Sequence, residues 1–110
     1  MSLLIDDPAA PVAPALAAVS DRLVELSGVE LWRLDDDQTT AAVGAAYALV
    51  TQAHTVALTL LAEADRRNLA GQTGAPSTQA WLQATRRVRP QTAKRDVELA
   101  RLVARAADLD

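Results

Sequence analysis

The stretch Ser77–Ala106, "STQAWLQATRRVRPQTAKRDVELARLVARA", decides the fold that we expect for this chain. Ala and Leu supply most of its apolar residues, and those after Pro90 recur at the three- and four-residue spacing of a helix. Proline suits the first turn of a helix, because an N–H at that position would have no partner. Ser77 or Thr78 can cap the helix before it. The stretch therefore predicts a C-terminal helical hairpin, with Trp81 as the main core anchor.

Upstream of the hairpin, the sequence predicts a long helix over about residues 38–68. Any of Asp35 to Asp37 can cap its start, and Asn68 tolerates the left-handed conformation that often ends a helix. Its apolar residues form two neighbouring seams. The first seam consists of Val43, Tyr47, Val50, His54, Ala57, Leu61 and Ala64, and the second of Ala42, Ala46, Leu49, Ala53, Val56 and Leu60. We expect other helices, from this chain or another, to cover this wide face.

The remaining segments complete an all-α prediction. Leu16, Val19 and Leu23 indicate a first helix over about residues 14–27, after a Pro/Ala-rich lead of residues 1–13 that we expect to be mobile. No segment has the alternating pattern of a strand. The 110 residues fit one core. We therefore expect a single domain over residues 14–110, a small bundle of about four helices with one long central helix and the hairpin.

The composition of the chain indicates where in the cell we expect it and excludes sites that are built from cysteine. The chain has no cysteine, which excludes disulfides and thiolate metal sites. Asp6 and Asp7 occur where a signal peptide carries basic residues, so we expect a cytoplasmic protein. The absence of charge between Asp37 and Glu63 raises the alternative of a transmembrane span. Gln52 and His54 lie near the middle of that stretch, which favours a buried helix of a soluble protein and no membrane contact.

The residues from Leu60 to Ala106 resemble those of domain of unknown function 222, the 13E12 repeat family. The matching pieces are "AEADRRNLA", "GAPSTQAWL" and "RVRPQTAKRDVELARLVARA", and the preceding "LDDDQTTAAVGAAYALVTQAHTVALT" is similar to the family's preceding helix. In actinobacterial proteins this domain commonly precedes an HNH endonuclease module. The chain departs from the family at Arg89, where a Ser is usual, and at Asn68, where a Gly is usual. The resemblance implies a helical domain associated with HNH nucleases.

We expect no enzyme activity, cofactor or metal. An HNH site needs several histidines in a ββα unit, whereas this chain has one histidine, no cysteine and no strand pattern, so the module is expected to be absent. His54 lies on the first apolar seam, where a hydrogen-bonded structural role is favoured over a ligand role. For the cluster Asp35 to Asp37, helix capping is favoured over cation binding.

Charge is segregated along the chain. Residues 1–62 hold two basic and eight acidic side chains, a balance of −6, whereas residues 63–110 hold nine basic and six acidic, a balance of +3. Such a field attracts a polyanion or the acidic half of another subunit. The candidate nucleic-acid-binding residues are Arg86, Arg87, Arg89, Lys94, Arg95 and Arg101, with Arg105 nearby. A solvated basic face is the competing interpretation.

The sequence thus favours a non-catalytic helical domain that binds DNA weakly and largely without sequence preference, through the basic corner between the last two helices. Two alternatives stay open. One is a protein–protein interaction or oligomerisation module, in which a homodimer buries part of Val43–Leu61. The other is a truncated remnant without independent activity.

Overall fold

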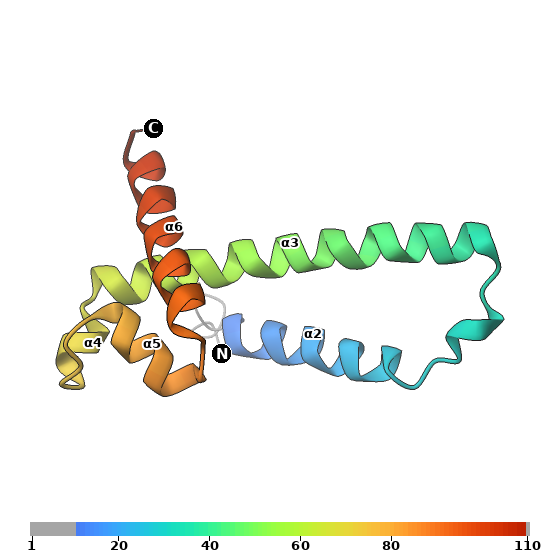
Figure 1. Ribbon diagram of the computed structural model, residues 1–110, viewed down its shortest axis with the longest axis horizontal. Coiled ribbons are helices and arrows are strands. Elements are labelled where there is room, and N and C mark those ends of the chain that lie inside the picture. Colours follow the sequence, from blue (N-terminus) through green and yellow to red (C-terminus); the bar gives the residue numbers. More distant parts are fainter. Residues whose placement is uncertain (1–10, 110) are drawn as a thin grey trace, which may run out of the picture. The chain divides into compact units, whose positions relative to one another are not determined.

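A computed structural model describes residues 11–109 of the chain, and its regular structure in that range is entirely helical. This confirms the all-α prediction. The helices are α2 (Val12–Leu26), η1 (Leu31–Arg33, a 3₁₀ turn), α3 (Asp36–Arg66), α4 (Leu69–Gln72), α5 (Thr78–Arg86) and α6 (Pro90–Leu109). They are labelled in Figure 1. Most of the predicted mobile lead, residues 1–10, lies outside the described residues, whereas Val12 and Ala13 already belong to α2.

The chain divides into two compact units, residues 1–40 and residues 41–110. The described part of the first unit contains α2 and η1. Helix α2 is followed by Ser27, whose hydroxyl donates to the carbonyl of Val24 at 2.6 Å, and by Gly28. The apolar residues Leu16, Val19 and Leu23 of α2 are about half exposed. The second unit contains most of α3 together with α4, α5 and α6, and it holds the basic corner.

Both ends of α3 are determined by short polar side chains. Asp35 accepts a hydrogen bond from the N–H of Gln38 at 2.7 Å, and the Gln38 side chain accepts one from the N–H of Asp35 at 3.0 Å. This reciprocal pair is a capping box, which satisfies two N–H groups at the helix start. After the last turn Asn68 adopts a left-handed conformation with φ 54°. The predicted cap and the predicted end are therefore both confirmed.

The segment between α3 and α5 was predicted only as a break in the helical pattern. It contains one further helical turn, α4, whose first free N–H groups include that of Gly71. The side chain of Asn68 accepts from this N–H at 3.1 Å. A side chain at position 71 would collide with Asn68, so glycine leaves room for this cap. Ser77 caps α5 by accepting from the N–H of Ala80 at 3.0 Å.

The core of the second unit lies where α6 crosses the C-terminal half of α3 (Figure 1). Ala93, Val97 and Ala100 are buried on α6, at the three- and four-residue spacing that places them on one face. Leu61 of α3 packs in the same cluster. The partly buried side chains of Leu58, Ala62, Trp81 and Leu82 complete it. Trp81 therefore contacts the core as predicted, but it shares the role with three leucines.

Much of the apolar face of α3, which we expected helices of this chain or another to cover, is exposed among the described residues of this chain. Val43, Tyr47 and Val50 are 53, 72 and 63% exposed. The helix is long and apolar enough to cross a membrane by length and composition alone, and little of its apolar stretch is buried. The physical reason is the length of α3, because α6 covers only the region around Leu58 and Leu61.

Candidate nucleic-acid interface

A turn of three residues, Arg87 to Arg89, joins α5 to α6. Arg87 follows the last residue of α5 with φ 52° and ψ 36°, the left-handed conformation, and its N–H donates to the carbonyl of Gln83. Glycine is the residue that adopts this conformation without steric cost. Arg89 precedes Pro90, and its carbonyl accepts from the N–H of Ala93 in the first turn of α6. The turn therefore presents two arginines at the apex of the hairpin.

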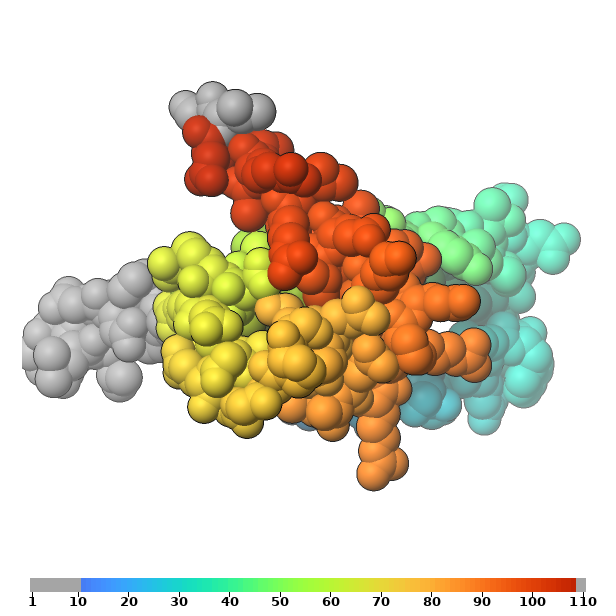
Figure 2. All heavy atoms as spheres, turned by 60° about the vertical axis from the view of Figure 1, so that its left-hand side comes forward, coloured from blue at the N-terminus to red at the C-terminus, as the bar shows by residue number. Residues whose placement is uncertain are grey.

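Four of the predicted basic residues surround this apex and are exposed, namely Arg87, Arg89, Lys94 and Arg95. In the described part of the chain, the only carboxylate within 4 Å of these four is that of Asp96, which lies 3.9 Å from Arg95. Figure 2 shows the end of α5 and the start of α6, in orange, as a projecting corner of the molecule. We call these four side chains the apex cluster.

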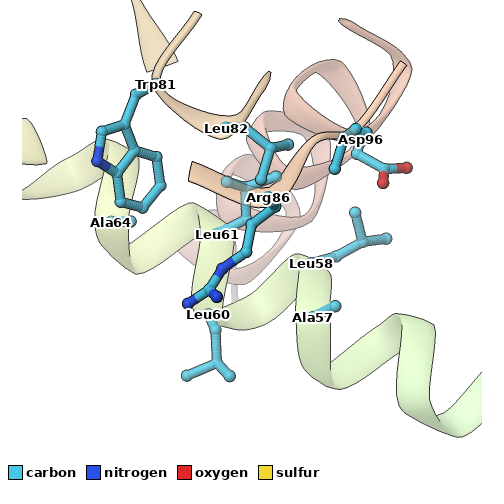
Figure 3. Close-up of a pocket in the computed structure, with 10 residues that line it drawn as sticks. Ala57, Leu58, Leu60, Leu61, Ala64, Trp81, Leu82, Arg86 and Asp96 are labelled. Carbon is cyan, nitrogen blue, oxygen red and sulfur yellow. The ribbon is translucent and has the colours of Figure 1, made fainter. Parts of the chain in front are cut away.

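Arg86 is oriented differently from the apex cluster. It lines an apolar pocket of about 380 Å³ between α3 and α5, together with Leu60, Leu61 and Trp81. Figure 3 shows its side chain extending from α5 towards Leu60. The pocket lining is almost entirely aliphatic and aromatic, with one guanidinium and the carboxylate of Asp96 as its charged groups. Arg86 is therefore next to the surface of α3 rather than at the apex of the turn.

Arg101 belongs to a polar link between α6 and α3. Its Nη2 and Nε donate to the two carboxylate oxygens of Asp65 at 3.0 and 3.1 Å. The buried hydroxyl of Thr78, in the first turn of α5, donates to the same carboxylate at 2.6 Å. Asp65 thus joins three helices through one side chain. A two-point guanidinium–carboxylate contact has a defined geometry. Arg101 therefore has a structural role between helices, in contrast to the side chains of the apex cluster.

The Asp65 link predicts acid sensitivity. The hydrogen bonds from Arg101, and then from Thr78, lower the pKa of Asp65 below its ordinary value. A carboxyl group with a lowered folded-state pKa contributes stability above its unfolded pKa of about 4, and this contribution is lost as the pH falls towards the folded-state value. Arg66 and Arg67 lower the pKa of Glu63 to about 2, so the contribution of Glu63 to stability is lost in the same direction of pH change.

We therefore expect the urea midpoint of the protein to fall between about pH 4 and pH 2. Asp65→Asn isolates the contribution of Asp65. At pH 7 this variant should be less stable by about 1 kcal/mol, since the hydrogen bonds to a charged acceptor are weakened at a partly exposed site. The difference should shrink as the pH falls below the unfolded pKa of about 4. An equal difference in stability at pH 7 and pH 2.5 would contradict the assignment.

His54 and Asp96 form a second link between α3 and α6. The imidazole Nε2 lies 3.1 Å from Oδ1 of Asp96, and both side chains are partly buried. The hydrogen bond that we expected for His54 is present. The contact also turns Asp96 towards α3, while the same Oδ1 stays 3.9 Å from Nε of Arg95. Glu98 is the exposed acidic residue that remains on this part of α6.

Other polar residues near the corner have structural partners or lie apart. The side-chain amide of Gln79 donates to that of Gln83 at 3.3 Å, whereas Gln91 is exposed on the first turn of α6. Asp35 caps α3, as described above. Among residues 11–109, no three His, Asp or Glu side chains are grouped so that they could hold a metal ion.

Comparison with known proteins identified no relative of this chain. No family model, no curated protein and no solved structure matches this chain.

Because Arg87 has a left-handed conformation, two substitutions can separate the effect of its backbone strain on stability from the effect of losing its charge. Replacing Arg87 by Gly removes the steric cost of a Cβ at positive φ, and we expect the free energy of unfolding to rise by about 0.5–1 kcal/mol. Arg87→Ala removes the same charge but keeps the Cβ, so it should not be stabilising. Urea unfolding of the two variants provides the measurement. A Gly variant no more stable than the Ala variant would show that the turn is unstrained.

Proposed function

We propose that the apex cluster binds the phosphate backbone of DNA, largely without sequence preference. The observation that supports this most is the grouping of Arg87, Arg89, Lys94 and Arg95 around one turn. All four are exposed, and among the described residues one carboxylate lies within 4 Å of them, that of Asp96 at 3.9 Å from Arg95. Lys and Arg side chains in such an arrangement can displace the cations condensed on a nucleic acid, which supplies most of the free energy of non-specific binding.

The helix that follows the turn adds to the positive potential. The first turn of α6 contains no acidic residue, so no carboxylate there offsets the partial positive charge of the helix N-terminus. Arg89 immediately precedes this turn. A phosphate group near the turn would therefore meet side-chain cations and the favourable end of the helix dipole together.

The polar residues near the corner favour non-specific binding over recognition of a sequence. Base edges are recognised mainly by arginine, asparagine and glutamine side chains that reach into a groove. Here Gln79 and Gln83 interact with each other, which leaves Gln91 as the exposed glutamine near the turn. The arginines at the apex are then expected to contact phosphates, which position a protein but carry no sequence information.

Fluorescence anisotropy with labelled DNA duplexes tests the proposal. At low salt the protein should bind two duplexes of unrelated sequence with similar affinity. The logarithm of the binding constant should fall linearly with the logarithm of the salt concentration, by about 0.9 per phosphate contact. Absence of binding at low salt would refute DNA binding. Tight binding to one duplex that resists salt would refute the non-specific version.

We propose that the chain is related to the 13E12 repeat family. The resemblance of Leu60–Ala106 to the 13E12 repeat family is compatible with a role beside a nuclease, and we propose a non-enzymatic, cytoplasmic domain on that basis. The His54–Asp96 contact supports a location away from the bilayer. A membrane-spanning α3 would bring Asp96 and its neighbours on α6 to the depth of the hydrocarbon core, where charged groups are costly.

A further inference from the structure

We infer that α3 pairs with α3 of a second copy of this chain, antiparallel and in one defined register. The interface consists of the second apolar seam, which we call the alanine seam. Its members are Ala42, Ala46, Leu49, Ala53, Val56 and Leu60. This inference concerns a different surface from the apex cluster and does not depend on DNA binding.

The alanine seam is a face of α3 that the folded unit leaves open. Successive residues of a helix are 100° apart, so Leu60 lies about 100° around the helix from its buried neighbour Leu61. Leu49, Val56 and Leu60 are 43, 44 and 43% exposed, and the three alanines are exposed as well. Apolar side chains, three of them Ala, repeat at spacings of four and three along a helix of 31 residues and form a continuous stripe, which marks an interaction site.

The residue sizes along the seam are complementary to those of an antiparallel copy. When Leu49 is placed opposite Ala53 of the second copy, Ala46 falls opposite Val56, and Ala42 falls opposite Leu60. A small residue then faces a large one in every layer, which fills the space between two helices evenly. A two-fold axis makes each contact occur twice, so six layers form from three kinds of pair.

The charges at the two ends of α3 agree with the same register. It places Asp35 opposite Arg67 of the second copy and Asp36 opposite Arg66. Arg66 and Arg67 share one carboxylate, that of Glu63, within their own chain, so this end keeps an excess positive charge. The other end carries Asp35, Asp36 and Asp37 without a basic residue in the first turn. Opposite charges therefore meet at both ends of the pair.

Parallel pairing and shifted antiparallel registers of α3 do not match residue sizes and charges in this way. A parallel pair in register sets Ala42, Ala46 and Ala53 against themselves, which leaves gaps between the larger layers. It also brings the three aspartates of one copy against those of the other. Shifting the antiparallel pair by seven residues in one direction places Leu60 opposite Asp35. The opposite shift places Ala42 opposite Arg67, so either shift puts an apolar residue against a charge.

The partner segment also suits the surface beside α5. In the inferred register the start of the partner's α3 lies next to Leu60, close to the pocket that Arg86 and Trp81 line. That segment of sequence is "TTAAVGAAY", Thr39 to Tyr47, in which most side chains are small. Small residues permit close approach of two helices. The short side chains thus occur where α5 restricts the space.

Disulfide trapping tests the register directly, because the natural chain has no cysteine. Two single variants, Ala42→Cys and Leu60→Cys, are refolded together and oxidised, with an affinity tag on one of them. Opposite residues of one layer lie within disulfide reach, whereas equal positions in the antiparallel pair are about 27 Å apart along the helix. We expect the mixed disulfide as the main product, and little disulfide within either variant alone. Thr51→Cys, an exposed control on the opposite face of α3, should form none.

Each other outcome overturns the inference. Efficient disulfide formation by Ala42→Cys alone would show a parallel pair. Equal yields from all pairings, including Thr51→Cys, would show unspecific collision. Sedimentation velocity of the unmodified protein should show a dimer at tens of micromolar, and a monomer throughout this range would also refute the pairing. None of these measurements involves DNA, so the failure of one proposal leaves the other intact.

Discussion

Leu61→Ala is expected to lower the free energy of unfolding by about 2–3 kcal/mol. Leu61 is buried in the cluster that joins α3 to Val97 and Ala100 of α6. Truncation of a buried leucine loses its transfer free energy and leaves a cavity, at a cost of about 2–5 kcal/mol. The lower part of this range applies because the side chain keeps 9% of its surface exposed. Since small domains are marginally stable, urea unfolding should show a large loss of folded protein.

Leu60→Ala is the matched control for this prediction. The two leucines are neighbours in the same helix, but Leu60 is 43% exposed and lies on the alanine seam. At concentrations where the chain is monomeric, its truncation should cost less than half as much as that of Leu61. At higher concentrations it should weaken the inferred dimer. Equal losses at both positions in the monomer would contradict the described placement of the core.

Replacing the whole apex cluster by alanine is expected to have the largest effect on DNA binding. With Arg87, Arg89, Lys94 and Arg95 removed, the salt dependence should flatten by about 0.9 for each phosphate contact that is lost. Up to four contacts are at stake, so binding at low salt should fall by several orders of magnitude. The loss should be the same on unrelated duplexes, because phosphate contacts carry no sequence information.

A double variant separates this local effect from a change in total charge. Arg87→Ala with Arg89→Ala removes two positive charges from the apex, and Arg22→Ala with Arg33→Ala removes two from the first unit. Only the apex variant should flatten the salt dependence. Equal effects of the two variants in anisotropy titrations would show that net charge, and not the corner, governs binding.

The ends of the helices were predictable from sequence because local groups determine them. Asp35, Asn68 and Ser77 each act through a backbone group three residues away, and such contacts follow from the order of residues alone. The start of α6 at Pro90 follows in the same way from the missing N–H. One short local element, α4, was not predicted. A four-residue helix is too short to produce a periodic pattern.

Contacts between residues far apart in the chain could not be predicted from the sequence patterns. Arg101 was predicted as a member of the basic face, whereas it pairs with Asp65, which is 36 residues away. The pattern of charges on one helix does not show which carboxylate of another helix a given arginine will contact. How much of α3 the chain's own helices cover was unpredictable for a related reason. Helical periodicity shows which face is apolar, but not how far the neighbouring helix extends along it.

The position of the three links between α3 and α6 has a consequence for the order of folding. His54 with Asp96, Leu61 with Val97 and Asp65 with Arg101 join residues 36 to 42 positions apart, whereas α5 and α6 are joined by a three-residue turn. Closing a long loop costs more entropy than closing a short one, so the hairpin can form early. Docking of the hairpin onto α3 then closes all three links in one late, cooperative step.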